Sequence, residues 1–134
     1  MQTVEKWGIF EAAVRGPQDG NPFTEQFFSA VFRGKCETVE VDGFYDGDGI
    51  YKVRFMPSFE GAYTYETRGS FPEAAGRGEF TVTAPGAGNH GPMRVVNQYH
   101  FAYEDGTPYY SVGTTCYVWC HQPEDIRQKT LEEL

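Results

Sequence analysis

The sequence lacks an excess of basic residues. Its 134 residues include 11 Lys and Arg against 19 Asp and Glu, which gives a net charge of -8 and a pI near 4.8. Nucleic-acid binding depends on clustered Lys and Arg that release counterions from the phosphate backbone. The basic residues here are scattered along the chain, so neither nucleic acid nor an anionic membrane is expected as a partner.

Long apolar runs are also missing. No stretch approaches the roughly 20 apolar residues that a helix needs to span a bilayer. Residues 1–6 contain no basic segment followed by an apolar one, which is the pattern of a secretory signal. The sequence as given therefore predicts a cytoplasmic protein unless a leader was removed.

Cysteine is scarce, with Cys36, Cys116 and Cys120 as the only three. An odd number at low density predicts reduced thiols rather than a disulfide scaffold. Cys116, Cys120 and His121 lie close together in sequence, but a structural zinc site takes four protein ligands and the chain offers no second pair. We expect no metal and no cofactor, with Cys116 packed as a small apolar side chain.

Turn-forming residues are abundant instead. Sixteen Gly and 8 Pro, with 40% hydrophobic and 16% aromatic residues, favour short strands around one core. Short alternating segments between Gly-rich turns predict an all-β, immunoglobulin-like β-sandwich. The expected strands are residues 4–15 (with a bulge or twist at Gly8), 23–33, 36–42, 51–57, 63–66 and 80–82.

The turn Asp46-Gly47-Asp48-Gly49 carries several carboxylates. Asp and Gly tolerate the positive φ that a tight hairpin demands. Asp46 and Asp48, with Asp42 nearby, also offer oxygen ligands of the kind that Ca²⁺ prefers, but the rest of an EF-hand-like loop is missing. We therefore expect a hairpin turn with solvated carboxylates.

Tyr63 stands two residues after Gly61, with Tyr65 as the next inward residue. This spacing fits a tyrosine corner, in which the phenol bonds back to upstream backbone, and Tyr65 then replaces the second cysteine of an antibody domain. Gly-x-Tyr pairs are common, so an ordinary strand is the alternative. In either case aromatic packing is expected to hold the two sheets together.

Residues 85–92 show no strand or helix pattern and predict a linker between residues 1–84 and 93–134. In the second segment we expect two strands, within residues 93–103 and 107–119, around the turn at residues 104–106. A helix is then expected to open at Pro123 and stop at Leu134, with Pro at its first position. This order is typical of the start of an α/β repeat with nothing after it.

Three blocks resemble a known family: residues 4–11, residues 43–57 and Gly88-Asn89-His90-Gly91-Pro92. They look like N-terminal β-sandwich domains that precede apiosidase-like (β/α)₈ glycoside hydrolase barrels. Residues 100–110 are similar to the lead-in hairpin of such barrels. Residues 113–117 stand where related hydrolases have Gly-Asp-Thr-Ala-Trp, but Thr114 replaces the Asp, whose sugar-binding role is therefore not carried over.

The resemblance implies that residues 93–134 are the lead-in hairpin and truncated first β/α unit of a barrel. In barrel enzymes the catalytic residues lie at the C-terminal ends of the strands. Glycoside hydrolysis needs two carboxyl groups that flank the glycosidic bond. We therefore expect no catalytic residue and no enzymatic activity in this chain. Trp119 and His121 lie just past the expected barrel strand. They would form the floor of a sugar subsite only in a full-length parent protein that contains the whole barrel.

Other candidate residues are the aromatic side chains of Trp7, Tyr45, Tyr51, Tyr63 and Tyr65, which would stack on sugar rings if exposed. Alternating aromatic residues in a small sandwich belong to the core in most cases, so about four of the five are expected to be buried. Tyr45, beside the Asp-Gly turn, is the best candidate for exposure. His90 is expected to be a loop residue that bonds backbone.

The leading hypothesis is a non-catalytic accessory domain that packs against its own C-terminal catalytic barrel and positions it. The alternative is a carbohydrate-binding module that tethers the enzyme to oligosaccharide in a plant or other complex glycan. A scaffold domain presents an apolar patch, whereas a module presents exposed aromatic rings with polar neighbours. We also expect some self-association through the truncated tail, whose strand lacks partners.

Overall fold

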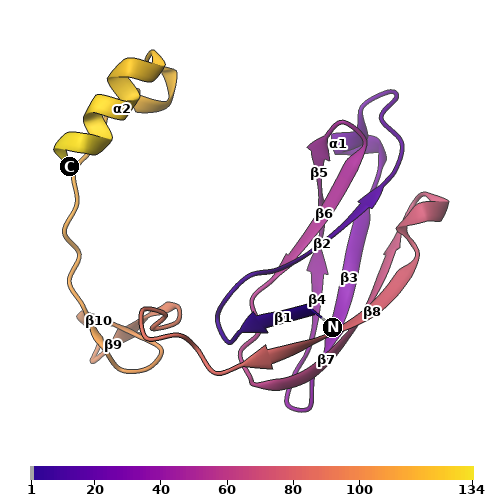
Figure 1. Ribbon diagram of the computed structural model, residues 1–134, viewed down its shortest axis with the longest axis horizontal. Helices are drawn as coiled ribbons and strands as arrows, with labels where there is room; N and C mark the ends of the chain where they lie inside the picture. Colours follow the sequence, from indigo (N-terminus) through magenta and orange to yellow (C-terminus); the bar gives the residue numbers. More distant parts are fainter. Residues whose placement is uncertain (1) are drawn as a thin grey trace.

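The computed structural model describes residues 2–134, which form three β-sheets (Figure 1). The first sheet has the order β1-β8-β7-β3-β4, the second β2-β6-β5 and the third β11-β10-β9. The predicted all-β class is thus confirmed. The strands are β1 (Gln2–Glu5), β2 (Phe10–Arg15), β3 (Phe28–Arg33), β4 (Thr38–Asp42), β5 (Phe44–Gly47), β6 (Ile50–Phe55), β7 (Gly61–Gly69), β8 (Gly76–Thr83), β9 (Met93–Val96), β10 (His100–Tyr103) and β11 (Pro108–Tyr109).

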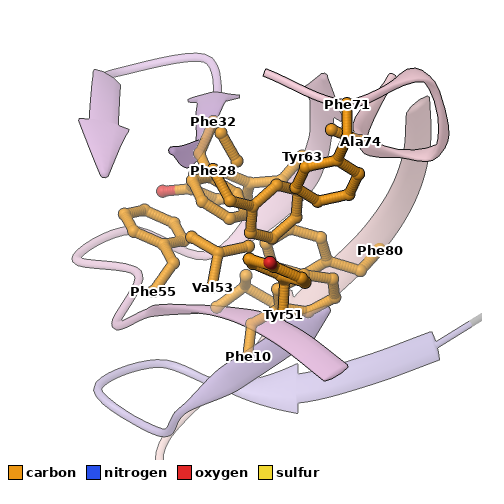
Figure 2. Close-up of a cluster of buried hydrophobic side chains, with 12 residues drawn as sticks. Phe10, Phe28, Phe32, Tyr51, Val53, Phe55, Tyr63, Phe71, Ala74 and Phe80 are labelled. Carbon is orange, nitrogen blue, oxygen red and sulfur yellow. The ribbon is translucent and has the colours of Figure 1, made fainter. Parts of the chain in front are cut away.

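The core lies between the first two sheets and consists mainly of aromatic rings (Figure 2). Phe10 of β2 stacks on Phe80 of β8 at a centroid distance of 4.0 Å. Phe32 of β3 stacks on Phe55 of β6 at 4.3 Å. Each pair joins one sheet to the other, so the aromatic packing expected from the sequence is confirmed. Stacked rings of this kind add a little to the stabilisation from burial alone.

Two expected strands are wrong in extent. Residues 4–15 divide between β1 and β2, which lie in different sheets. The change occurs at Trp7, whose φ of 64° reverses the chain. Residues 23–33 begin instead with the short helix α1 (Pro22–Glu25), and β3 starts only at Phe28. Proline is favoured in the first turn of a helix, where its missing N–H costs nothing.

The predicted Asp-Gly turn is confirmed between β5 and β6. Gly47, Asp48 and Gly49 all have positive φ, at 93°, 50° and 71°. The pairing register shifts between Tyr45 and Gly47. The Asp46 carboxylate lies 2.6 Å from Lys52 Nζ, so it forms an ion pair with the neighbouring strand.

Tyr63 is buried, with 1% of its surface exposed. Its hydroxyl donates to Glu37 Oε1 at 2.5 Å, and the same oxygen accepts the Ser58 N–H at 2.9 Å. Burial, followed by the Glu37 carboxylate, raises the pKa of Tyr63, whereas the Phe59 backbone N–H acts in the opposite direction. The hydroxyl thus donates to a side chain of the β3–β4 hairpin and not, as a tyrosine corner would predict, to the upstream backbone.

The third sheet, here called the hairpin sheet, consists of β9, β10 and β11. The first expected strand, residues 93–103, divides into β9 and β10, which pair with each other. The expected pairing around the turn at residues 104–106 is present between β10 and β11, but β11 contributes only two residues. Residues 110–118 carry no strand and run as extended chain toward helix α2 (Glu124–Glu133), which stands apart from the sandwich (Figure 1). The expected strand over residues 109–117 is therefore absent here, because a barrel strand needs hydrogen-bonded neighbours on both edges.

Helix α2 begins one residue later than expected, with Pro123 as its N-cap. Glu124 and Asp125 occupy its first turn, where carboxylates favour the positive end of the helix dipole. Two short 3₁₀ turns complete the described chain, η1 (Pro72–Ala74) and η2 (Trp119–His121). Neither α2 nor any shorter helix within residues 2–134 has the length and apolar character of a membrane span.

Candidate functional site

One face of the hairpin sheet is made of apolar side chains. The register places Phe101 opposite Val95 and Tyr109, and Tyr103 opposite Met93. Side chains opposite one another point to the same side of a sheet, so these residues share a face. We call it the hairpin face: Met93, Val95, Phe101, Tyr103 and Tyr109.

The hairpin face is open to solvent. Met93 is 46% exposed, Val95 66% and Phe101 41%. Its aromatic rings hold one another in place, since Tyr109 packs edge-on against both Tyr103 and Phe101, with centroid distances of 5.4 and 6.5 Å. An exposed apolar face of fixed geometry is typical of a protein interaction surface.

The segment expected to be a free linker is bound to the β1–β2 turn. Glu5 Oε2 accepts the Gly86 N–H at 2.6 Å, and Glu5 Oε1 accepts the Asn89 amide at 2.9 Å. Asn89 Nδ2 also donates to Lys6 O at 3.1 Å. The hydrogen bond from the Gly86 N–H is the main cause that lowers the pKa of Glu5, and the bond from Asn89 is the second. We call the group Glu5, Trp7, Asn89 and Gly91 the junction clamp.

Trp7 completes the junction clamp. Lys6 Nζ lies 4.2 Å from the centroid of the Trp7 ring, and a Cβ added at Gly91 would come within 2.7 Å of the same ring. Gly91 also has a φ of +79°, which L side chains rarely adopt. Only glycine fits this close approach, so the clamp fixes the path of the chain from the sandwich into the hairpin sheet.

His90 departs from its expected role. The sequence predicts a loop residue that bonds backbone, but His90 Nδ1 lies 2.8 Å from Asp105 Oδ2. The His90 ring packs near Tyr103 at a centroid distance of 5.4 Å. Its carbonyl does accept the Asp105 N–H, at 3.3 Å. Asp105 is 15 residues away in sequence, and only the folding of β9 and β10 brings the two together.

The pKa of Asp105 falls to about 2, first because of the bond to His90 and then because of the Thr107 N–H. Its neighbour Glu104 accepts from Arg94 Nε at 2.7 Å. Both carboxylates line a recess of 380 Å³ beside Trp7. Both side chains are therefore engaged in contacts that hold the β10–β11 turn.

The tail residues Trp119 and His121 lie on the same 3₁₀ turn, η2. Trp119 Nε1 donates to Arg127 O of α2 at 3.3 Å, and His121 is exposed. Their role in a sugar subsite stays a prediction. Cys116 is exposed, contrary to the expected apolar packing. Within residues 2–134 no group of three or more His, Cys, Asp or Glu is arranged to hold a metal ion.

The five aromatic candidates follow the expected trend only partly. Tyr51 and Tyr63 are buried, while Tyr45 and Tyr65 pack against the core with part of their surface exposed, and Trp7 is partly buried in the junction clamp. The most exposed rings of the sandwich are instead phenylalanines that we had assigned to strands or passed over. They are Phe23, Phe27, Phe44 and Phe59.

A family model described as a domain of unknown function (DUF5060) matches residues 3–70, just over half of the chain. The chain belongs to the DUF5060 family. No curated protein matches this DUF5060 chain. A solved structure described as "a putative glycoside hydrolase from Bacteroides vulgatus ATCC 8482" matches it with a TM-score of 0.91 and 40% identity.

That match covers 98% of the DUF5060 chain described here and 26% of the Bacteroides chain. The DUF5060 chain thus spans about a quarter of the length of this relative. The match extends over the hairpin sheet and tail as well as the sandwich, because so little of the chain lies outside it. The same arrangement of elements therefore occurs as one part of a larger chain.

Proposed function

We propose that this DUF5060 chain is a non-catalytic accessory domain of a glycoside hydrolase, which packs against an apiosidase-like (β/α)₈ catalytic barrel and positions it. In this proposal residues 1–84 form an immunoglobulin-like sandwich and residues 85–92 connect it to the barrel. Residues 93–134 are the lead-in hairpin and the first β/α unit. The hairpin face is the surface that receives the barrel.

The hairpin face is the observation that carries the proposal. Burying apolar surface contributes about 25 cal/mol per Å², and five neighbouring apolar side chains supply such surface on one rigid face. The junction clamp supports the same role, because a docking surface positions a partner only if its own orientation is fixed. The match covers only 26% of the Bacteroides chain, which leaves room in that chain for a further domain.

The carboxylates at the junction support a structural role rather than an acid–base role. A glycosidase needs a general acid whose pKa is raised so that it carries a proton near neutral pH. Asp105 has the opposite character, with a pKa of about 2, and Glu104 is paired with Arg94. Asp105 is therefore not prepared to protonate a glycosidic oxygen.

The first test compares two proteins: the 134-residue chain, and the protein translated from the whole reading frame that contains it. Both are assayed on neutral and pectic plant oligosaccharides. We expect hydrolysis only by the longer protein. Hydrolysis by the 134-residue chain alone would contradict the proposal.

In the longer protein, Phe101→Asp tests docking directly. A charge placed in a buried apolar interface is expected to lower the free energy of unfolding by about 3 kcal/mol, measured by chemical denaturation. Tyr99→Asp is the matched control, because Tyr99 lies in the β9–β10 turn and is 84% exposed. Equal stability of the two variants would show that the hairpin face is not an interface.

A further inference from the structure

Helix α1 lies at the end of the sandwich away from the hairpin sheet (Figure 1). A second recess is lined by residues of α1 and its neighbours. It has a volume of 310 Å³ and opens between the α1 segment and the corner where β4 passes into β5. Its floor is formed by the buried rings Phe28 and Tyr51. Its walls include Phe23, Gln26, Phe27, Asp42, Phe44 and Tyr45. We call it the corner cleft.

Three phenylalanines in the walls are unusually open to water. Phe23 is 72% exposed, Phe27 56% and Phe44 38%. Phenylalanine is among the residues most often buried, yet here three exposed phenylalanines line one recess. Large exposed apolar groups that gather at a concave site are typical of ligand-binding surfaces.

The walls are held in place before any ligand arrives. The Phe23 ring packs edge-on against Tyr45 at a centroid distance of 5.1 Å, and the Tyr45 hydroxyl accepts the Gly49 N–H at 3.0 Å. The Arg54 guanidinium lies 5.0 Å from the centroid of the Phe44 ring. Rings that are already fixed lose little conformational entropy on binding.

Two polar groups of opposite character accompany the rings. Gln26 Oε1 accepts from the Ser70 hydroxyl, which leaves the Gln26 amide N–H₂ as a donor. Ser70 Oγ also accepts the Phe27 N–H at 3.1 Å, so it orients this wall of the cleft. The Asp42 carboxylate makes no side-chain hydrogen bond or ion pair with any residue from 2 to 134 and remains an acceptor.

We propose that the corner cleft binds a ring of a neutral saccharide. A sugar ring has an apolar C–H face that suits aromatic walls, and each hydroxyl both donates and accepts hydrogen bonds. One hydroxyl donates to Asp42 and another accepts from Gln26. A purely apolar peptide side chain would desolvate both groups without pairing them, which is costly.

The charge of the cleft selects against acidic sugars and phosphates. The unpaired Asp42 carboxylate lies in the wall of a chain whose net charge is -8, so an anionic ligand is repelled. The cleft volume is at the lower end of the roughly 300–1,000 Å³ that small-molecule sites occupy. The expected ligand is therefore one or two neutral sugar units rather than a long segment of polysaccharide.

The experiment is calorimetric titration of the 134-residue chain with the neutral tetrasaccharides of xylose, glucose and galactose, and with trigalacturonate as the acidic comparison. We expect binding of at least one neutral saccharide with a Kd of about 1 mM or tighter, since small ligands with few contacts bind weakly. We expect no binding of trigalacturonate.

Two conservative variants locate the site. Phe44→Leu keeps an apolar side chain but removes the ring, and is expected to weaken binding about tenfold. Asp42→Asn keeps the shape but loses the charge, and is expected to weaken binding and reduce the discrimination against trigalacturonate. Tyr99→Ala, a change at an exposed ring outside the corner cleft, is the control with unchanged affinity. Thermal melting of each variant confirms that it is folded.

Several outcomes would overturn the proposal. Failure of all three neutral tetrasaccharides to bind refutes it, and equal affinity of folded Phe44→Leu and the unchanged chain places the ligand elsewhere. Preference for trigalacturonate refutes the assignment to neutral sugars. None of these results bears on the accessory role, because that proposal rests on the hairpin face and the corner cleft includes none of its residues.

Discussion

The hydroxyl of Tyr63 depends on a carboxylate 26 residues away in sequence. Glu37 Oε1 accepts hydrogen bonds from both this hydroxyl and the Ser58 N–H. A Cβ added at Gly34 would come within 2.6 Å of the Tyr63 ring. The β3–β4 hairpin therefore packs over the ring and also supplies its acceptor. A buried hydroxyl with a charged acceptor makes a stronger bond than a neutral pair.

Tyr63→Phe is expected to lower the free energy of unfolding by about 1–2 kcal/mol, because it removes this bond and leaves Glu37 with one fewer donor. The measurement is urea denaturation followed by fluorescence. Tyr65→Phe is the matched control: its hydroxyl makes no hydrogen bond with residues 2–134, so a change below about 0.5 kcal/mol is expected. Similar losses in both variants would argue that ring packing alone matters.

Single residues show where sequence reasoning reached its limit. The Gly61-x-Tyr63 spacing indicated that Tyr63 has a structural role. No local sequence pattern connects Tyr63 to Glu37, because their contact depends on how the β3–β4 hairpin packs against β7. The exposed ring of Phe23 was missed because residues 23–33 read as one strand. The Asn21-Pro22 pair before it was the available signal, since Pro is favoured at the start of a helix.

The junction between β1 and β2 shows the same limit for an element. The apolar side chains change parity along the sequence near Gly8, which predicted a bulge or a twist there. A bulge and a crossing between two sheets change parity in the same way, and only the tertiary partners distinguish them. Here Lys6 N–H pairs with Thr83 of β8 and Trp7 N–H with Pro57 after β6, so the turn bridges the sheets.

The β10–β11 turn should respond to acid. The pKa of Asp105 falls from 3.8 to about 2 on folding, so this carboxylate stabilises the folded state fully above about pH 4 and loses its effect as the pH falls toward 2. Relative to the intrinsic exchange rate at each pH, the protection of the turn amides is expected to fall over this range more in the unchanged chain than in Asp105→Asn, which lacks the titrating group.

Asp19→Asn is the control for this pH dependence, because Asp19 is an exposed carboxylate in the loop before α1 with no ion pair in residues 2–134. It should leave the exchange profile of the turn unchanged. A profile for Asp105→Asn that matches the unchanged chain between pH 4 and pH 2 would show that the contact with His90 does not hold the turn.

For the molecule as a whole, strand alternation and the three sequence blocks were enough to predict an all-β fold and a relation to glycoside hydrolase chains. The arrangement of residues 110–134 was not predictable in the same way. Val112 is 91% exposed and Tyr117 86%, although both belong to a run apolar enough for a buried strand. An apolar sequence forms a strand only where neighbouring strands supply hydrogen-bond partners.

The exposed hairpin face also predicts association of the 134-residue chain with itself. Sedimentation velocity at increasing protein concentration is expected to show a growing dimer fraction, because two such faces bury one another's apolar surface. Val95→Asp should remove the dimer, while Ile9→Asp, a change at a side chain that is 58% exposed outside the hairpin face, should not. A single monomeric species at all concentrations would contradict this expectation.

The parallel pairing of β1 with β8 has a mechanical consequence. Gln2 lies opposite Phe80, and Glu5 opposite Thr83, so the chain enters this pair at one end and leaves it at the other. Tension applied between the entry and the exit loads the hydrogen bonds of the pair in shear, so that they resist together instead of opening one by one. A pulling force on this domain is therefore borne by these hydrogen bonds together.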